Sequence, residues 1–390
     1  MISVADALEA LFALISPQDI EDVALRHAAG RVLARDVCAA RTQPPFAASS
    51  MDGYAVNGAE VEADAMFKVV GESAAGHGYS GTVGPGQAVR IFTGAPVPQG
   101  SNFVVIQEDT IRRGDLITLN RSVGAKDNIR PAGADFKAGD KVTAPCLLGA
   151  ADVALLAAMN IAAVPVRRRP TVALMATGDE LVMPGEIPGP DQIIASNTFG
   201  LAAMIEALGA SARVLPIARD THGSLTEAFR LAASADLIVT IGGASVGDHD
   251  LVAPVAAKLG MEQSFYKVAM RPGKPLMAGR LNGTPMIGLP GNPVSAMVCG
   301  TIFVTPVIRA MLGLRAQAVG GQNARLATAL PKNGPREHYM RANVEKDGLW
   351  VADQQDSSLL SVLSGSNALL VRPPHDPPRT AGETVRYIPI

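Results

Sequence analysis

Hydrophobic and polar positions follow different rhythms in different parts of the chain. Residues 3–29 begin with apolar side chains at helical spacing, and this pattern breaks at a Ser-Pro pair. Across 66–142, short apolar runs alternate with turns that contain glycine or proline, which is typical of β-strands. Residues 146–166 predict a further helix and strand. The basic run RRRP at 167–170 then has the composition of a linker.

From residue 171 the pattern changes to alternating strands and helices. Apolar strands are predicted at 172–176, 212–218 and 236–241, with helices at 197–208 and 225–233 between them. Strands that are joined by crossover helices lie parallel, so this region predicts an α/β domain with a parallel sheet. After about residue 314 only short strands are predicted, which indicates a small all-β domain at the C-terminus.

The composition permits large cores and gives no global signal for a charged partner. The 390 residues are 48% hydrophobic and 18% charged, which predicts several folded domains. A net charge of −2 argues against nucleic acid or an anionic membrane as a partner. The three cysteines have no metal-binding spacing, and the N-terminal stretch lacks the basic region of a signal peptide. A cytoplasmic location is therefore expected.

One long segment without charge could be mistaken for a membrane span. No charged residue occurs between Arg280 and Arg309, and that length is sufficient to cross a bilayer. The segment contains GTPMIGLPGNPVS, whose prolines and glycines would leave backbone groups unsatisfied in lipid. A buried strand, a turn and a helix are predicted instead.

Polar, glycine-rich turns follow the predicted strands of the α/β domain. Because ligands of open α/β sheets bind outside the carboxyl ends of the strands, these turns are expected to form one site. They are TGDE at 177–180, Asp220, GGASVGDHD at 242–250, RPGKP at 271–275 and LPGNPVS at 289–295.

These turns carry groups that suit a phosphorylated ligand. Asn292 is expected to cap a helix whose first residue is Pro293, and the N-terminus of that helix offers free donors for an anion. Backbone N–H groups of the glycine turns can likewise bind phosphate, with Arg271 and Lys274 supplying positive charge. The carboxylates Glu180, Asp220 and Asp250 are then available for Mg²⁺, which binds a few carboxylates together with phosphate oxygens. The sequence therefore predicts a phosphorylated or nucleotide ligand with Mg²⁺.

Each of these features has a simpler interpretation when it is taken alone. A Gly-Gly pair is usually just a tight turn, and an acidic residue at a strand end often caps a helix. Their combination along one sheet edge is what favours a site. The motifs of P-loop proteins, of dinucleotide-binding folds and of serine hydrolases are not found, which argues against those classes.

Several segments, taken in order along nearly the whole chain, resemble one family. The chain is similar to the molybdopterin molybdenumtransferases, the bacterial MoeA type that also forms the E domain of gephyrin. The segments are SSMDGYAV at 49–56, PGQAVRIFTGAPVPQG at 85–100, VIQEDT at 105–110, NIRPAGADFKAGD at 128–140, TGDEL at 177–181, GGASVGDHD at 242–250 and the stretch from RPGKP to GLPGNPVSAM.

The resemblance implies an activity, an assembly and a domain plan. Such proteins insert molybdate into adenylylated molybdopterin with Mg²⁺ and release AMP, and they are homodimers. The implied fold is multidomain α/β and β. It comprises a mixed N-terminal domain, a β-rich inserted domain, a parallel-sheet α/β domain similar to MogA, and a C-terminal β-barrel. In the same order, these four domains would comprise residues 1–41 plus 139–168, residues 42–138, residues 169–314 and residues 315–390.

The resemblance also assigns roles residue by residue. Asp52 and Thr93 would face the site from the second subunit and act in catalysis with Glu180, Asp220 and Asp250, and these last three would also bind the metal. Residues that would bind the cofactor precursor or molybdate are Gly242, Gly243, Ser245, Gly247, Arg271, Lys274, Pro290, Asn292, Pro293, Ser295, Arg336, Arg341 and Ser357.

Two other functions stay open at this point. The α/β domain also resembles the molybdopterin adenylyltransferase fold, although those enzymes typically carry GGTG where this chain has GGASVG. A non-catalytic scaffold of the gephyrin type is the second alternative. The predicted protein partners are molybdopterin adenylyltransferase and the molybdoenzymes that receive the cofactor.

Overall fold

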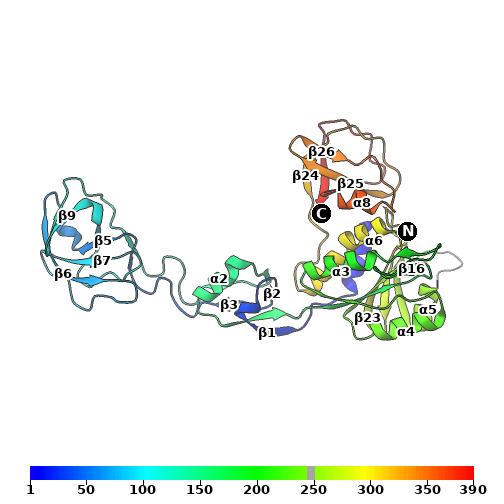
Figure 1. Ribbon diagram of the computed structural model, residues 1–390, viewed down its shortest axis with the longest axis horizontal. Coiled ribbons are helices and arrows are strands. Elements are labelled where there is room, and N and C mark those ends of the chain that lie inside the picture. Colours follow the sequence, from blue (N-terminus) through cyan, green and yellow to red (C-terminus); the bar gives the residue numbers. More distant parts are fainter. Residues whose placement is uncertain (244–250) are drawn as a thin grey trace. The chain divides into compact units, whose positions relative to one another are not determined.

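The computed structural model describes residues 1–243 and 251–390, and these form two compact units (Figure 1). The larger unit contains Met1–Glu21, Gly30–Ala34 and Val166–Ile390, and the smaller unit contains Asp22–Ala29 and Arg35–Pro165. The division into four domains stays a prediction.

A six-stranded sheet forms the centre of the larger unit, in the order β18-β15-β19-β23-β22-β20. The first four strands are parallel, whereas β22 and β20 run antiparallel, so the sheet is mixed and the prediction of a parallel sheet was only partly right. The strands are β15 (Thr171–Ala176), β18 (Ser211–Val214), β19 (Leu237–Ile241), β20 (Met261–Tyr266), β22 (Met277–Leu281) and β23 (Thr284–Leu289).

Helices cover both faces of this sheet, because the central strands are apolar on both sides. Val172 and Leu174 of β15 pack in a core with α3 and α6, while Ala173 and Met175 pack with α4 and α5. Figure 1 shows these two pairs of helices on opposite sides of the sheet. The helices are α1 (Val4–Ala13), α3 (Asn197–Ala207), α4 (His222–Ala232), α5 (Val252–Lys258), α6 (Pro293–Cys299) and α7 (Thr305–Met311).

The segment without charge is a strand, a turn and a buried helix, as predicted. After β23 the chain turns at Pro290–Asn292, and α6, a π-helical stretch η4 (Gly300–Val304) and α7 continue as one helix. By length and composition alone this helix, Pro293–Met311, could cross a membrane, but 78% of its most apolar window is buried within the protein. It is therefore a core helix of this fold.

The C-terminal strands form a second sheet that packs on the first. Its order is β21-β25-β27-β28-β24, with β26 paired to β25. Tyr339, Leu369 and Val371 of this sheet join the core that contains α6 and α7. An isolated bridge between Leu326 and Leu349 brings the residue after β24 beside β26. The elements are β21 (Met270–Arg271), β24 (Gln322–Arg325), β25 (Glu337–Glu345), β26 (Gly348–Val351), α8 (Leu360–Ser364), β27 (Ala368–Arg372) and β28 (Thr384–Pro389).

The smaller unit is rich in strands, as predicted for residues 66–142. Its main sheet has the order β8-β5-β7-β6-β10-β9, and alternate residues such as Phe67 and Ile117 fill its core. The strands are β5 (Gly53–Val56), β6 (Met66–Ser73), β7 (Gln87–Ile91), β8 (Phe103–Ile106), β9 (Thr110–Arg113) and β10 (Leu116–Leu119). Sequence patterns did not identify β5 or β9.

Short elements complete the structure. A four-stranded sheet has the order β1-β14-β2-β13, and three two-stranded pairs are β11-β4, β12-β3 and β16-β17. The elements are β1 (Ile20–Ala24), η1 (Leu25–His27), β2 (Val32–Leu33), β3 (Val37–Cys38), β4 (Ala48–Ser49), η2 (Gly58–Glu60), η3 (Gln107–Asp109), β11 (Ile129–Arg130), β12 (Lys141–Val142), β13 (Cys146–Leu147), α2 (Ala150–Ala158), β14 (Ala163–Arg167), β16 (Leu181–Val182) and β17 (Ile193–Ile194).

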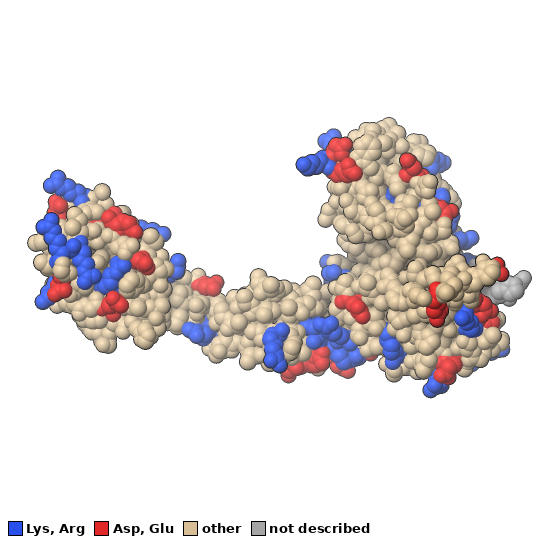
Figure 2. All heavy atoms as spheres, viewed as in Figure 1, with Lys and Arg blue, Asp and Glu red and all other residues tan. Residues whose placement is uncertain are grey.

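Surface charge of both signs is spread over the protein. Figure 2 shows acidic side chains interspersed with basic ones on the visible face, with one gathering of basic side chains on the strand-rich unit. This distribution agrees with the net charge of −2. An anion-binding site in the larger unit must therefore depend on nearby side chains and backbone groups and not on the net charge of the protein.

Candidate functional site

A cavity of about 770 Å³ lies at the carboxyl ends of three parallel strands of the larger unit. It is lined by Thr177-Gly178 after β15, by Gly242-Gly243 after β19 and by the turn Pro290–Pro293 after β23. The polar turns predicted to converge on one sheet edge therefore do so. Of the predicted site residues, those that line the cavity are Glu180, Asp220, Gly242, Gly243, Pro290, Asn292 and Pro293.

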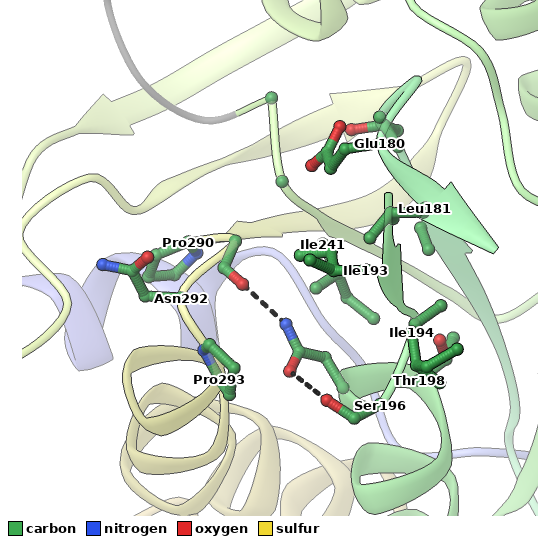
Figure 3. Close-up of a pocket in the computed structure, with 18 of the residues that line it drawn as sticks. Glu180, Leu181, Ile193, Ile194, Ser196, Thr198, Ile241, Pro290, Asn292 and Pro293 are labelled. Carbon is green, nitrogen blue, oxygen red and sulfur yellow. Dashed lines mark hydrogen bonds between the residues drawn. The ribbon is translucent and has the colours of Figure 1, made fainter. Parts of the chain in front are cut away.

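The turn after β15 places a carboxylate directly over the backbone. Gly178 has φ +147°, a conformation that favours glycine. A Cβ on Gly178 would lie 2.4 Å from Oε2 of Glu180, so the glutamate side chain occupies the space that the missing side chain leaves. Figure 3 shows Glu180 at one end of the cavity.

Arg219 holds this turn in place, although sequence patterns did not single it out. Its Nη1 donates to the carbonyl oxygens of Gly178 at 3.3 Å, Asp179 at 3.0 Å and Leu181 at 3.1 Å. The backbone N–H of Asp220 donates to Oδ1 of Asp179 at 3.2 Å. Arg219 therefore ties the strand end that carries Asp220 to the turn that carries Glu180. The sequence feature that could have identified Arg219 is its position directly before Asp220.

Two glycines open the loop that follows β19. Gly242 has φ +91° and Gly243 has φ +62°. A Cβ on Gly242 would lie 2.9 Å from the carbonyl oxygen of Thr177, and one on Gly243 would collide with Val252. Both positions therefore require glycine for backbone packing. The predicted site residues Ser245, Gly247 and Asp250 lie outside the described residues.

The start of α6 forms the opposite side of the cavity. Asn292 is the residue before the helix, but its side chain makes no capping bond, contrary to the prediction that it caps the helix. Its Nδ2 donates instead to Oγ of Ser357 at 3.0 Å, and the N–H of Val294 donates to the Ser357 carbonyl at 3.0 Å. Ser357 is thereby fixed beside the cavity without lining it.

The remaining predicted binding residues do not line the cavity. Ser295 lies inside α6 and is 4% exposed, so it belongs to the core. Arg271 and Lys274 are exposed residues of the RPGKP segment. Arg336 donates to the carbonyl of Met270 at 3.3 Å, which anchors it to the same segment.

A fully buried arginine lies in the C-terminal sheet. Arg341 is 0% exposed, and its Nη2 donates to the carbonyl oxygens of Gln354 at 3.2 Å and Asp356 at 2.9 Å. Its Nε and Nη1 have no partner among the described residues. A buried guanidinium with unpaired donors costs free energy, so these donors are suited to an anionic ligand.

His338 adjoins this group and was not predicted. Arg271 and Arg372 are its neighbours on the two adjacent strands. Burial, and after it the positive charges of Arg271 and Arg341, lower the pKa of His338 to about 4. The imidazole is therefore neutral near pH 7, and the arginines supply the positive charge of this region.

In the smaller unit, Asp52 and Thr93 form a close pair. Oδ1 of Asp52 accepts bonds from the backbone N–H and from Oγ1 of Thr93, both at 2.7 Å. These two bonds lower the pKa of Asp52, the backbone bond being the larger cause. The two residues that the resemblance named are thus partners in the structure.

Replacing Thr93 by valine is expected to raise the pKa of Asp52 toward its usual value. The change removes the hydroxyl bond that stabilises the carboxylate and leaves the backbone bond in place. Titration of the Asp52 carboxyl carbon by NMR measures the effect, with Thr93→Ser as the control that keeps the hydroxyl. An unchanged pKa in the valine variant would show that the hydroxyl does not support the charge.

The described carboxylates fit Mg²⁺ only together with a ligand. No group of three or more His, Cys, Asp or Glu side chains able to hold a metal occurs within residues 1–243 and 251–390. Glu180 and Asp220 both line the cavity, and Mg²⁺ commonly takes one or two carboxylates plus phosphate oxygens and water. The donor set therefore fits Mg²⁺ that arrives with a phosphorylated substrate.

Three family models match the chain. Residues 2–160 match the MoeA N-terminal region (domains I and II), residues 173–310 match a probable molybdopterin-binding domain, and residues 323–390 match the MoeA C-terminal region (domain IV).

Curated proteins and solved structures are similar over nearly the full length. A protein of Nostoc sp. named molybdopterin molybdenumtransferase is 37% identical over 96% of this chain and 90% of its own. One of the same name from Haemophilus influenzae is 34% identical over 96% and 94%. The crystal structure of the molybdopterin biosynthesis MoeA protein of Pyrococcus horikoshii aligns over 100% of both chains, with a TM-score of 0.86 and 27% identity.

Proposed function

Because this chain belongs to the molybdopterin molybdenumtransferase family, we propose that it inserts molybdenum from molybdate into adenylylated molybdopterin and releases AMP, a step of molybdenum cofactor biosynthesis. It is a transferase that acts on small molecules. The relatives that match nearly the whole chain carry this name, which favours insertion over the adenylyltransferase and scaffold alternatives.

The observation that carries the proposal is the convergence of Glu180, Asp220 and two glycine turns on one cavity. Such turns let a phosphate approach the backbone closely, and the carboxylates can hold the cation that offsets its charge. The diphosphate of the substrate is proposed to bind at this end, with Asp250, which lies outside the described residues, as a further acid.

Cleavage requires that charge on the departing AMP be offset. The P–O bond of the phosphoanhydride breaks, the bridging oxygen stays on one phosphate, and the other phosphorus takes an oxygen from water or molybdate. Glu180 and Asp220 would hold Mg²⁺, which supplies electrostatic stabilisation to the phosphate oxygens when it is bound. Arg219 keeps the two carboxylate-bearing turns in register through its three backbone bonds.

Molybdate is a tetrahedral dianion and needs positive donors. Arg341 offers two buried N–H-bearing nitrogens that have no partner within the described part of the chain, and Arg271 and Lys274 add exposed positive charge. Ser357, held against the start of α6 by Asn292, is proposed as a further contact. Arg336 would orient the RPGKP segment through the Met270 carbonyl.

The assembly and the remaining partners stay predictions. The resemblance implies a homodimer in which Asp52 and Thr93 of the partner subunit complete the site. Contacts with the adenylyltransferase and with recipient enzymes, and a cytoplasmic location, are proposed on the same ground.

Turnover tests the proposed function directly. The purified protein is incubated with adenylylated molybdopterin and Mg²⁺, with and without molybdate, and released AMP is measured together with metal bound to the product. AMP and metal-loaded cofactor are expected only when molybdate is present. Substrate that stays bound and intact under all conditions would instead indicate a carrier or scaffold.

A further inference from the structure

Asp52 and Thr93 lie at the ends of two paired strands in the smaller unit. Asp52 directly precedes β5, and Thr93 is two residues beyond the end of β7. These two strands are antiparallel neighbours in which Tyr54 lies opposite Arg90 (Figure 1). The two bonds that Thr93 donates to Asp52 therefore depend on how firmly the two strand ends are held together.

The side chain of Arg90 joins the strand that carries it to the chain around Asp52. Its Nη1 donates to the Gly53 carbonyl at 3.0 Å, and its Nη2 donates to Oε1 of Gln107 at 2.7 Å. The backbone N–H of Gln107 donates in turn to the Asp52 carbonyl at 3.0 Å. Arg90 therefore holds the residue after Asp52 directly, and it holds Asp52 itself through Gln107.

Two aromatic rings keep the guanidinium of Arg90 in this place. Its Cζ lies over the rings of Tyr54 and Phe92, at 5.1 Å and 4.7 Å from their centroids. The ring faces are electronegative, so they attract the cation, and its planar edge stays free to donate hydrogen bonds. Tyr54 is buried in the core of this unit, and Phe92 directly precedes Thr93. Arg90 is thus fixed between the chain segments that carry Asp52 and Thr93.

The carbonyl that accepts the first bond from Arg90 is also fixed. A Cβ on Gly53 would lie 2.0 Å from the Val105 carbonyl oxygen, so the backbones of β5 and β8 approach each other closely at this point. A side chain does not fit there unless a strand moves. The bond from Arg90 to the Gly53 carbonyl therefore connects the guanidinium to a strand that has little freedom to shift.

We infer that Arg90 is a positioning residue, which acts through Asp52 by holding it within bonding distance of Thr93. This inference rests on the proposed function, in which Asp52 acts in catalysis. The bonds from Thr93, the backbone bond before the hydroxyl bond, are the larger causes of the lowered pKa of Asp52, and the charge of Arg90 lowers it further. Arg90 thus supplies both a geometry and a charge, and substitutions can separate the two.

Arg90→Met removes the charge and both hydrogen bonds, and it keeps a long flexible side chain beside the rings. The kcat for adenylylated molybdopterin is expected to fall about 10²-fold, because a small displacement of a catalytic group has an effect of this size. The KM for molybdate should not change, since the proposed molybdate donors belong to the larger unit. A pH titration of the Thr93 amide resonance by NMR should show a raised pKa of Asp52 and a weaker response of the amide.

Arg90→Lys separates the geometry from the charge. Lysine keeps the positive charge, but it cannot donate two bonds from a planar fork or stack on both rings. We therefore expect the pKa of Asp52 to stay near its wild-type value, while kcat falls nearly as far as in the methionine variant.

Gln107→Leu tests the same network with a milder change. Gln107 is exposed, and leucine removes the acceptor of the Nη2 bond while the backbone bond to Asp52 remains. A loss of about tenfold in kcat is expected, which is the size of effect of one hydrogen bond to a charged group. This variant decides the question even where an Arg90 variant folds poorly, and wild-type kcat in it would contradict the inference.

Arg121→Met is the matched control. Arg121 belongs to the same unit, its side chain is 87% exposed, and its Nε pairs with Asp64 at 3.3 Å. Its loss removes the same charge from the unit without touching the network of Arg90. The kcat and the titration of the Thr93 amide are expected to match the wild type.

Two further results would overturn the inference. Wild-type kcat in Arg90→Met or in Arg90→Lys would show that the bonds of Arg90 position nothing that turnover needs. A Thr93 amide that titrates in Arg90→Met as it does in the wild type would show that Asp52 and Thr93 stay paired without Arg90. A wild type that releases no AMP would remove the proposed function, and the titration would still decide whether Arg90 holds the pair.

Discussion

Turnover of adenylylated molybdopterin is expected to fall by at least about 10²-fold when Glu180 is replaced by glutamine. The substitution keeps the size of the side chain, which occupies the space over Gly178, and removes its negative charge. One of the described carboxylates available for Mg²⁺ is then lost, so more Mg²⁺ is needed for half-maximal rate. AMP release at a series of Mg²⁺ concentrations measures both effects.

Glu186→Gln provides the control for Glu180. Glu186 lies in the same segment outside the cavity lining, and its Oε2 accepts a bond from the N–H of Met183 at 2.8 Å. A glutamine oxygen accepts the same bond, so this variant removes one nearby negative charge without touching the site. A Glu180→Gln enzyme that keeps the wild-type rate and Mg²⁺ dependence would exclude Glu180 from catalysis.

Replacing Arg341 by methionine is expected to lower molybdate-dependent turnover by about 10²-fold or more. The variant removes a buried guanidinium whose Nε and Nη1 have no partner among the described residues, and loss of one such electrostatic group typically has an effect of this size. The apparent KM for molybdate should rise, while the affinity for magnesium ADP should not change. Arg341→Lys is expected to fail as well, because an ammonium group cannot reproduce the planar fork.

Arg213→Met is the matched control for Arg341. Arg213 also carries a buried Nε for which residues 1–243 and 251–390 supply no partner, and its Nη1 and Nη2 donate to Ser234 Oγ at 2.9 Å and to the Leu231 carbonyl at 3.0 Å. It lies outside the site, so its loss should leave the molybdate dependence unchanged. Equal KM values for molybdate in the wild type and in Arg341→Met would show that the Nε and Nη1 groups of Arg341 do not bind molybdate.

The location of the cavity could be predicted from sequence, because one physical rule determines it. Carboxyl ends of parallel strands meet at one edge, so Glu180, Asp220, Gly242 and Pro290 had to lie near each other once their strands were identified. Their convergence on one cavity confirms this part of the prediction.

The prediction of site residues from sequence failed where it depended on the direction in which a side chain points. Ser295 is two residues beyond Pro293 in a helix, so it points about 200° around the axis from Pro293 and faces the core. The role of Arg219 depends on how the turn after β15 folds back, which the periodicity of the sequence does not encode. The antiparallel edge, in contrast, had a readable signal: Asn282-Gly283 joins β22 to β23 with φ of +49° and +87°, as an Asn-Gly hairpin requires.

The first helix, α1, belongs to a core some of whose other members come roughly three hundred residues later in the chain. Val4, Leu8 and Leu11 of α1 share one core with Phe303 and Ile308, and Ile2 is hydrogen-bonded to Lys267 and Ala269. During synthesis the apolar face of α1 therefore stays exposed until roughly three hundred further residues have been added. Contacts so distant in sequence are slow to close. The larger unit can complete its core only late in translation, and until then its first helix is a surface that chaperones or other nascent chains can bind.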